Sequence, residues 1–234
     1  MANLLISEIF GATIQGEGSL IGRQTVFIRT AGCDYRCAWC DTLYAVDPVH
    51  RPDWQRMSSH EVLEEVETLT HGNPILITLS GGNPALQNFN ALIDLGHDKG
   101  YRFAMETQGS VSPDYLSRLD YLTLSPKPPS SQQRTDWSKL DNNVRKAPKQ
   151  THLKVVIADE DDYHYARALA DRYPELPLTL QPCNLDTMDE ESADVDALND
   201  QLKWIMQRCQ QDHWYAPSLL PQLHVMLWNN ERAV

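Results

Sequence analysis

The sequence lacks the features that mark membrane, exported and nucleic-acid-binding proteins. It has no run of about 18 apolar residues, so no membrane-spanning helix is expected. The first residues, MANLLISEIF, have neither a basic start nor a small-residue cleavage site, and we therefore expect no export signal and a cytoplasmic location. Basic residues are few: 20 stand against 32 acidic ones. The resulting net charge of −12 argues against the phosphate backbone of nucleic acids as a partner.

Cysteine is also scarce, and its distribution excludes a disulfide framework. The five cysteines are an odd number, and three of them lie within eight positions, at Cys33, Cys37 and Cys40. In a chain without an export signal, such a cluster indicates metal binding in a reducing compartment. Cys183 and Cys209 are isolated. Cys209 falls on the apolar face of a helix expected near 195–209, so we expect it in the core.

The rest of the chain alternates between β-rich apolar runs and amphipathic helical patterns. The first helix opens with Ser58-x-x-Glu61, which is typical of a capping box. The expected strands are Thr25–Arg29, Ile75–Leu79, Arg102–Met105, Tyr121–Leu124, Leu153–Ile157 and Leu178–Gln181. The expected helices between them are Ser58–Thr68, Pro84–Gly96, Pro113–Leu119 and Asp161–Tyr173.

This alternation predicts an α/β fold whose parallel strands are joined by right-handed crossovers. Six strands are too few for a closed eight-stranded barrel, so we expect an open partial (β/α) barrel of about six parallel strands. The length suits a single domain over residues 1–234. Residues 126–150 are rich in Pro, Ser, Gln, Lys and Arg with little periodicity, and predict one long loop.

Unusual motifs follow the expected strands at their carboxyl ends. In partial and full barrels, this is the edge on which the chemistry collects. The motifs are the cysteine run, SGGNP, METQG, LSPKPP and QPCN. Their placement predicts one active site at this edge of the sheet.

Cys33, Cys37 and Cys40 suit an iron–sulfur cluster that keeps one iron available. Three thiolates on one loop can hold three irons of a [4Fe–4S] cubane, which leaves the fourth iron free to bind a substrate or cofactor. The alternative is a structural zinc site with His50 as the fourth ligand. Structural zinc sites more often pair two C-x-x-C units at a distance, and the sequence has no second pair.

The cysteine run resembles the radical S-adenosylmethionine superfamily, whose hallmark is CxxxCxxC with an aromatic residue before the last cysteine. Trp39 occupies that place. Within the superfamily, the chain resembles the 7-carboxy-7-deazaguanine synthases over nearly its whole length. The motifs that carry this resemblance are IQGEG at 14–18, FIR at 27–29, CDT at 40–42, SGGNP, METQGS, LSPKP and QPCN, in this order.

The resemblance implies a radical S-adenosylmethionine fold and a set of cofactor ligands. Gly81 and Gly82 correspond to the strand that approaches the methionine amino group, and Glu106 suits the ribose hydroxyls. The family's usual GGEP is GGNP here, so Asn83 replaces a glutamate and offers a neutral amide to the ammonium. The residues implied to bind the cofactor are Trp39, Asp41, Gly81, Gly82, Asn83, Glu106, Ser125, Pro126, Lys127, Gln181, Pro182, Cys183 and Asn184.

The implied substrate is 6-carboxy-5,6,7,8-tetrahydropterin. Arg29 would hold its carboxylate with a bidentate fork that lysine cannot copy. Thr42 resembles a magnesium ligand, one hydroxyl that would hold Mg²⁺ weakly together with substrate oxygens. The run Leu223–Leu227 is expected to dock as a final strand and bring the terminal carboxylate of Val234 to the substrate. The residues implied to bind the substrate are Ile14, Gln15, Gly16, Glu17, Arg29, Ser80 and Val234.

The implied reaction is hydrogen abstraction from C6 of the pterin, ring contraction, return of the hydrogen and loss of ammonia, giving 7-carboxy-7-deazaguanine, a queuosine precursor. The protein would position the cofactor and exclude water, while the radical comes from the cofactor. The resemblance also implies a homodimer and a reduced flavodoxin or ferredoxin as electron donor. Two alternatives stay open: an activase of glycyl-radical enzymes, and a zinc-stabilised binding module without catalysis.

Overall fold

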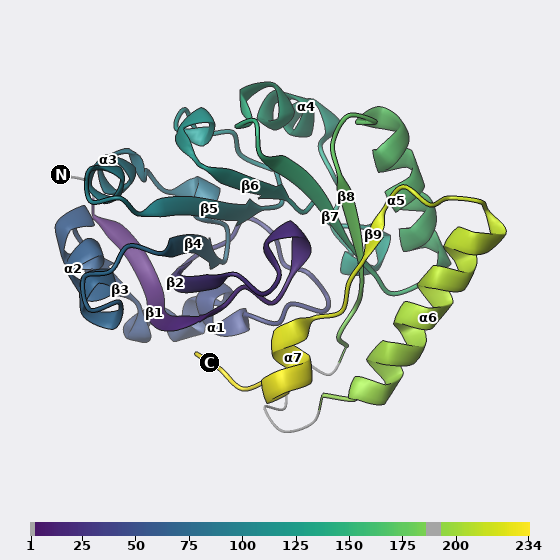
Figure 1. Ribbon diagram of the computed structural model, residues 1–234, viewed down its shortest axis with the longest axis horizontal. Helices are drawn as coiled ribbons and strands as arrows, with labels where there is room; N and C mark the ends of the chain where they lie inside the picture. Colours follow the sequence, from purple (N-terminus) through teal and green to yellow (C-terminus); the bar gives the residue numbers. More distant parts are fainter. Residues whose placement is uncertain (1–2, 186–192) are drawn as a thin grey trace.

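The computed structural model describes residues 3–185 and 193–234. A nine-stranded sheet runs through this part of the chain, in the order β3-β1-β2-β4-β5-β6-β7-β8-β9. Figure 1 shows the sheet curving without closing into a barrel, with the larger helices outside it. The strands are β1 (Leu4–Ile14), β2 (Gln24–Thr30), β3 (Gln55–Met57), β4 (Leu76–Gly81), β5 (Arg102–Thr107), β6 (Tyr121–Leu124), β7 (Thr151–Ile157), β8 (Leu178–Pro182) and β9 (Ser218–Leu219).

The sheet is parallel from β2 onwards, which confirms the open α/β architecture. Each neighbouring pair from β2 to β9 is parallel, whereas β1 pairs with both β2 and β3 in the antiparallel sense. The six expected strands are β2, β4, β5, β6, β7 and β8. The sequence analysis did not predict β1, β3 and β9, which extend the two edges of the sheet.

The larger helices cover the outer face of the sheet, and they are α2 (Ser59–Leu69), α3 (Asn90–Asp98), α4 (Trp137–Lys146), α5 (Glu160–Arg172) and α6 (Val195–Gln211). The two short helices α1 (Leu43–Val46) and α7 (Leu223–Trp228) each contribute a residue to the cavity described below. The capping box of α2 is present: Ser58 N donates to Glu61 at 2.7 Å, and Glu61 N donates back to Ser58 at 3.3 Å. No helix of the described residues is long and apolar enough to cross a membrane.

Four segments differ from the expectation. The helix expected at Pro84–Gly96 is a 3₁₀ turn followed by α3, and Pro113–Leu119 holds only the 3₁₀ turn Leu116–Arg118. Residues 126–150 are not one long loop, because α4 begins there, with the Asp136 side chain accepting from the backbone of Ser138 and Lys139. Leu223–Leu227 is not a strand but lies in α7, whose first N–H donates to Gly16 O at 2.9 Å.

Strand alternation divides the sheet into an apolar outer face and a polar inner face. On β2, Val26 and Ile28 are fully buried against the helices, while Phe27 and Arg29 point to the inside. The main core lies between the sheet and the helices, and Cys209 of α6 is 4% exposed in it, as expected. Inside the curve, a small apolar cluster of Leu20, Leu76, Ala104 and Tyr121 fills the space near the amino ends of the strands. The carboxyl ends are left open for a cavity.

Candidate active site

A cavity opens at the carboxyl ends of the parallel strands and gathers most of the predicted site residues. Loops after β2, β4, β5, β6 and β8, the start of the chain and its end all contribute to the lining. The predicted residues that line it are Ile14, Gln15, Gly16, Glu17, Arg29, Cys33, Cys37, Trp39, Cys40, Asp41, Thr42, Ser80, Gly81, Gly82, Glu106, Lys127, Gln181, Cys183, Asn184 and Val234. Four predicted residues are not among the lining: Asn83, Ser125, Pro126 and Pro182.

The three cysteines of the loop after β2 are half-buried at one end of this cavity. Gln108 Nε2 lies 3.6 Å from Cys33 Sγ, and the hydroxyl of Thr42 lies 3.7 Å from Cys40 Sγ. In residues 3–185 and 193–234, no three His, Cys, Asp or Glu side chains converge on a point that suits a single metal ion. A cubane cluster differs, because each cysteine binds a different iron. Three thiols spread over one loop and facing one cavity therefore fit a cluster better than a lone zinc ion.

Burial and mutual repulsion oppose the ionisation of these thiols. Burial raises the pKa of Cys37 to about 11, and Cys33 and Cys40 add to the shift. The pKa values of Cys33 and Cys40 are also raised, again mainly by burial. Thiolates are the form that binds iron, so bound metal must supply the positive charge that holds them ionised. Lys127 contributes a nearby cation that lowers the pKa of Cys37.

Gly81 and Gly82 are required by the packing of β4 against the cysteine loop. Gly81 has φ +108°, and a Cβ atom there would collide with the backbone of Thr30. A Cβ atom on Gly82 would collide with the carbonyl of Gly32, directly before Cys33. The pair therefore lets two strand ends meet at the base of the cysteine loop. Both glycines also line the cavity, where a backbone without side chains leaves room for a ligand.

Asn83 lies behind the cavity and is fully buried. Its Nδ2 donates to Asp34 at 2.9 Å and to Ser110 at 3.1 Å, and its Oδ1 accepts from Thr107 at 2.8 Å. Its Oδ1 also accepts from Ala85 N at 3.2 Å, which caps the 3₁₀ turn Pro84–Leu86. Both polar atoms of this amide are therefore engaged in cross-linking three loops, and its contact with the cofactor's ammonium stays a prediction.

The loop after β6 brings Lys127 across the cavity to the cysteine loop. Lys127 Nζ donates to Ser125 at 3.2 Å and lies 5.8 Å from the centre of the Trp39 ring. The Trp39 indole donates to Ser130 at 2.9 Å. Ser125 is 1% exposed and lies outside the lining, and its link to the cavity is this hydrogen bond from Lys127. Pro126 likewise stays outside the lining, as does Pro182 at the end of β8.

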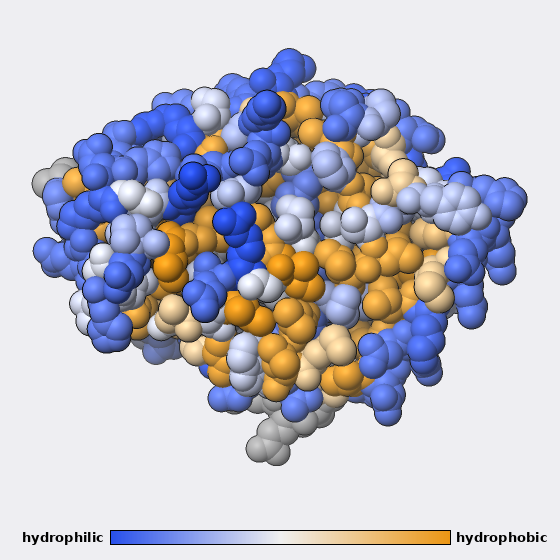
Figure 2. Space-filling view, viewed as in Figure 1, coloured by the Kyte–Doolittle hydropathy of each residue, from blue (hydrophilic) through white to orange (hydrophobic). Residues whose placement is uncertain are grey.

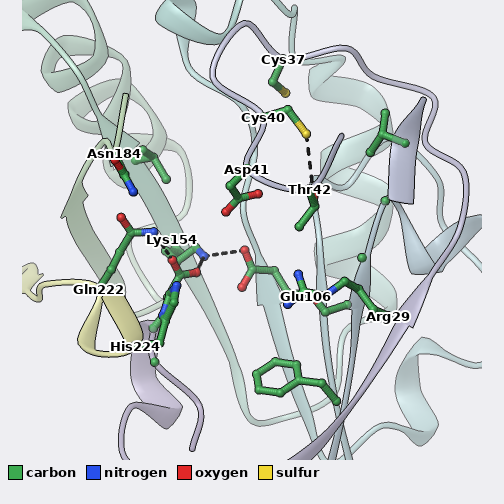
Figure 3. Close-up of a pocket in the computed structure, with 18 of the residues that line it drawn as sticks. Arg29, Cys37, Cys40, Asp41, Thr42, Glu106, Lys154, Asn184, Gln222 and His224 are labelled. Carbon is green, nitrogen blue, oxygen red and sulfur yellow. Dashed lines mark hydrogen bonds and ion pairs between the residues drawn. The ribbon is translucent and has the colours of Figure 1, made fainter. Parts of the chain in front are cut away.

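Lys154 of β7 is a buried cation that the sequence analysis missed. Its side chain is 3% exposed, and its Nζ pairs with Glu17 and, at 2.5 Å, with Glu106 (Figure 3). Burial alone would lower the pKa of Lys154, but the two carboxylates raise it above its ordinary value. Lys154 thus links Glu17, predicted to bind substrate, to Glu106, predicted to bind the cofactor.

Glu17 is held by donors from three distant segments. Gln181 of β8 donates to its Oε1 at 2.8 Å and Gln222 at 2.7 Å. Burial acts to raise the pKa of Glu17, but Lys154, His224 and the hydrogen bonds lower it below its ordinary value of 4.5. Glu17 is therefore an ionised acceptor, and both its oxygens are oriented before any ligand arrives. His224 of α7 packs on Gly16, where a Cβ atom would overlap its ring.

Arg29 lies on the opposite wall and is already paired with a carboxylate. Its Nε is 2.7 Å from Glu8 Oε1, and its guanidinium lies 5.3 Å from the Phe10 ring centre and 5.7 Å from that of Tyr44. These contacts hold the guanidinium plane in place. Thr42 is 9% exposed beside it, and its side chain makes no capping hydrogen bond to α1. Figure 3 shows Arg29, Thr42 and Glu106 grouped on one side of the cavity, with Gln222 and His224 on the other.

The lining residues that sequence analysis missed are Lys154, Gln108, Gln222, His224, Glu231, Tyr35, Phe10, Phe27, Val46, Thr107, Val156 and Ala233. Of these, only Lys154 carried a usable signal, a lysine within the apolar strand HLKVVI. Such a strand in a parallel sheet is buried on both faces, so a charged residue there requires a buried partner.

The arrangement has a thiol-rich end and a polar end. The thiol end, with Gln108, Trp39 and Lys127, suits an iron–sulfur cluster and a ligand bound to it. The polar end presents ionised Glu17 and the guanidinium of Arg29, which suit a small molecule with both donor groups and an anionic group. Both ends belong to one cavity, so a ligand bound at one end would face a ligand bound at the other.

Known proteins resemble the chain both in sequence and in fold. The Radical SAM superfamily profile matches residues 27–126. A 7-carboxy-7-deazaguanine synthase of Bacillus cereus is 41% identical over 100% of both chains, and that of Bacillus subtilis is 39% identical over 98% of both. The crystal structure of QueE from Escherichia coli superposes with a TM-score of 0.70 at 21% identity, covering 95% of each chain. At this level of identity, the structural likeness shows that the two chains share a fold.

Proposed function

Because this chain belongs to the 7-carboxy-7-deazaguanine synthase family of radical S-adenosylmethionine enzymes, we propose that it converts 6-carboxy-5,6,7,8-tetrahydropterin to 7-carboxy-7-deazaguanine and ammonia. The observation that supports this reaction is the two-ended cavity. Cys33, Cys37 and Cys40 stand at one end, and Glu17 and Arg29 stand at the other. We also propose that residues 1–234 form one radical S-adenosylmethionine domain.

The three cysteines would hold a [4Fe–4S] cluster whose fourth iron binds S-adenosylmethionine. When bound, the cluster and S-adenosylmethionine supply an electron and the radical that removes a hydrogen atom from C6 of the pterin. Gln108 and Lys127 orient the thiol end, and Glu106, fixed by Lys154, offers its free oxygen to hydroxyl groups. With both ligands bound, the lining would exclude water from the space between the two ends.

The polar end would bind the pterin. Glu17 stays ionised and accepts hydrogen bonds from the amino-pyrimidinone edge, beside Gln15 and the Gly16 backbone. Arg29 uses Nε toward Glu8, which leaves its terminal nitrogens for the substrate carboxylate. The carboxylate of Val234, which also lines the cavity, would accept from the substrate.

We assign Mg²⁺ to the hydroxyl of Thr42 together with substrate oxygens. The support is that this hydroxyl faces the cavity next to Cys40 and does not serve as a helix cap. Magnesium accepts such hard oxygen ligands and retains waters. Thr42→Ala should abolish the stimulation of turnover by Mg²⁺ while leaving S-adenosylmethionine cleavage without substrate unchanged. A stimulation equal to that of the wild type would remove Thr42 from the site.

The proposed partners are a second copy of the chain and a reduced flavodoxin or ferredoxin, in the cytoplasm. Support for the homodimer comes from exposed apolar side chains: Met206 of α6 is 42% exposed, and Met226 and Leu227 of α7 are 46% and 55% exposed. Figure 2 shows apolar surface gathered over α7 and the adjoining side of α6. Sedimentation velocity would test this, since a Met226→Glu/Leu227→Glu variant should be a monomer.

The decisive experiment is an anaerobic assay of the reconstituted enzyme with S-adenosylmethionine, dithionite and the carboxy-tetrahydropterin, followed by mass spectrometry. The expected product is 7-carboxy-7-deazaguanine, absent with Cys37→Ala. Cleavage of S-adenosylmethionine without this product would favour another radical reaction, such as activation of a glycyl-radical enzyme. Zinc in place of iron and sulfide would favour the binding module.

A further inference from the structure

The last residues of the chain return to the first strand of the sheet. Arg232 Nε donates a hydrogen bond of 2.8 Å to Oε2 of Glu8 in β1. The guanidinium carbon of Arg232 also lies 3.7 Å from the centre of the Tyr44 ring in α1. Figure 1 shows the yellow tail after α7 running back toward β1 and α1. Arg232 therefore joins the end of the chain to two elements that flank the cavity.

The surface that receives Arg232 is itself fixed. Tyr44 donates through its hydroxyl to Glu8 Oε1 at 3.0 Å, and its carbonyl accepts from the Trp54 indole at 2.8 Å. The Glu8 side chain is 12% exposed, whereas that of Arg232 is 42% exposed. A half-buried carboxylate and an aromatic face thus form a socket, and the arginine enters it from the solvent side.

The two residues after Arg232 reach the cavity. Upstream, Asn230 accepts from Asn184 at 2.8 Å, so the tail is held on both sides of Glu231. Ala233 and Val234 line the cavity. Ala233 has φ +63°, a left-handed conformation that an alanine adopts at a cost, and this turn aims the last residue. An anchor next to this turn is needed to offset that cost.

We infer that Arg232 is a positioning residue whose contact with Glu8 and Tyr44 holds the Val234 carboxylate in the substrate end of the cavity. This inference rests on the proposed function, in which that carboxylate binds the pterin. Glu8 divides its oxygens, with Oε1 toward Arg29 and Tyr44 and Oε2 toward Arg232. Glu8 therefore holds both the end of the chain, through Arg232, and Arg29, which would bind the substrate carboxylate.

The test uses Arg232→Ala, with Arg51→Ala as a matched control on an exposed arginine of the turn Pro48–Asp53. Carboxypeptidase release of Val234, followed by mass spectrometry of the intact reconstituted enzyme, reports tail docking without any turnover. We expect release of Val234 to be roughly tenfold faster in Arg232→Ala, because a stacked, charge-assisted contact of this kind favours the docked tail by about that factor. The KM for the pterin should rise by a similar factor while kcat and substrate-free S-adenosylmethionine cleavage stay near wild type. Arg51→Ala should match the wild type in all of these measurements.

Two conservative variants separate the charge from the stacking. Tyr44→Phe keeps the ring under Arg232 but removes the hydroxyl from Glu8, and Arg232→Lys keeps a cation but loses the planar fork. For each of these variants, the rate of Val234 release and the KM for the pterin should lie between the values for the wild type and for Arg232→Ala. Unchanged release in Arg232→Ala would overturn the inference, and so would faster release with an unchanged KM. A wild type that makes no deazaguanine would instead refute the proposed function, and carboxypeptidase release would still show whether Arg232 holds the tail.

Discussion

The side-chain amide of Asn83 donates a hydrogen bond of 2.9 Å to the carboxylate of Asp34, one residue after the first cysteine. The same Asp34 oxygen accepts from Gln108 at 2.8 Å. The amide at position 83 is thus matched to an acid in the cysteine loop, where a glutamate would oppose it. The surroundings of position 83 in this chain therefore suit a neutral amide better than a carboxylate.

Asn83→Glu should therefore destabilise the fold, because it places a carboxylate at a fully buried position and next to the carboxylate of Asp34. We expect a loss of about 2–4 kcal/mol in the free energy of unfolding, measured by urea denaturation. The double variant Asn83→Glu/Asp34→Asn should recover about half of the loss. Asn88→Glu adds the same charge at an exposed position and should change little. If the double variant lost as much free energy of unfolding as Asn83→Glu alone, repulsion by Asp34 would not be the cause of the destabilisation.

The second prediction separates cluster ligands from the other cysteines. Replacing Cys33, Cys37 or Cys40 by alanine should remove most bound iron and sulfide and abolish cleavage of S-adenosylmethionine, because all three face the cavity. Cys209→Ala should keep the iron content and lose only about 1–2 kcal/mol of stability from a small core cavity. Cys183→Ala, which removes a buried thiol from the cavity lining, should also keep its iron. Loss of iron in Cys183→Ala or Cys209→Ala would contradict a three-cysteine cluster.

The third prediction concerns Arg29. In Arg29→Lys the single ammonium should pair with Glu8, so the substrate carboxylate would lose its partner. The KM for the pterin should rise by roughly 30-fold, equivalent to about 2 kcal/mol, with the cluster intact. A pterin without the carboxylate should show little difference between the two enzymes. Equal losses with both substrates would exclude Arg29 as the carboxylate ligand.

The parallel strands were predictable because each is a short apolar run beside an amphipathic helix. β1 was not predicted, since its place depends on pairing with β2 and β3 rather than on a local pattern. The strands β3 and β9 have three and two residues, too few to show alternation. The run Leu223–Leu227 is equally ambiguous between strand and helix, and its docking onto Gly16 selects the helix.

The site was predictable where it follows strand ends, since the carboxyl ends of parallel strands meet at one edge. Lys154 and Gln222 escaped prediction because no spacing relates them to Glu17, which they contact only in the folded chain. Asn83 was placed at the cavity by motif position alone. Its side chain turns the other way, because Asp34, Thr107 and Ser110 offer a buried amide all the partners it needs.

The last prediction concerns His152 of β7, which is 5% exposed below Lys154 and contacts the hydroxyls of Ser19 at 2.8 Å and Thr123 at 3.0 Å. Burial and then Lys154 lower the pKa of His152 to about 4 from its ordinary value of 6.5. Between these values the unfolded chain binds a proton that the folded chain does not, so neutral His152 contributes stability above pH 6.5 that is lost as the pH falls toward 4. The full contribution of this pKa difference to the free energy of unfolding is about 3 kcal/mol.

His152→Gln should be less stable than the wild type at neutral pH but should lose less stability on acidification. Urea denaturation at a series of pH values between 4 and 6.5 would measure this difference. His60→Gln, at an exposed position, should keep the slope of the wild type. Parallel slopes for His152→Gln and the wild type would mean that His152 is not the group that titrates on unfolding.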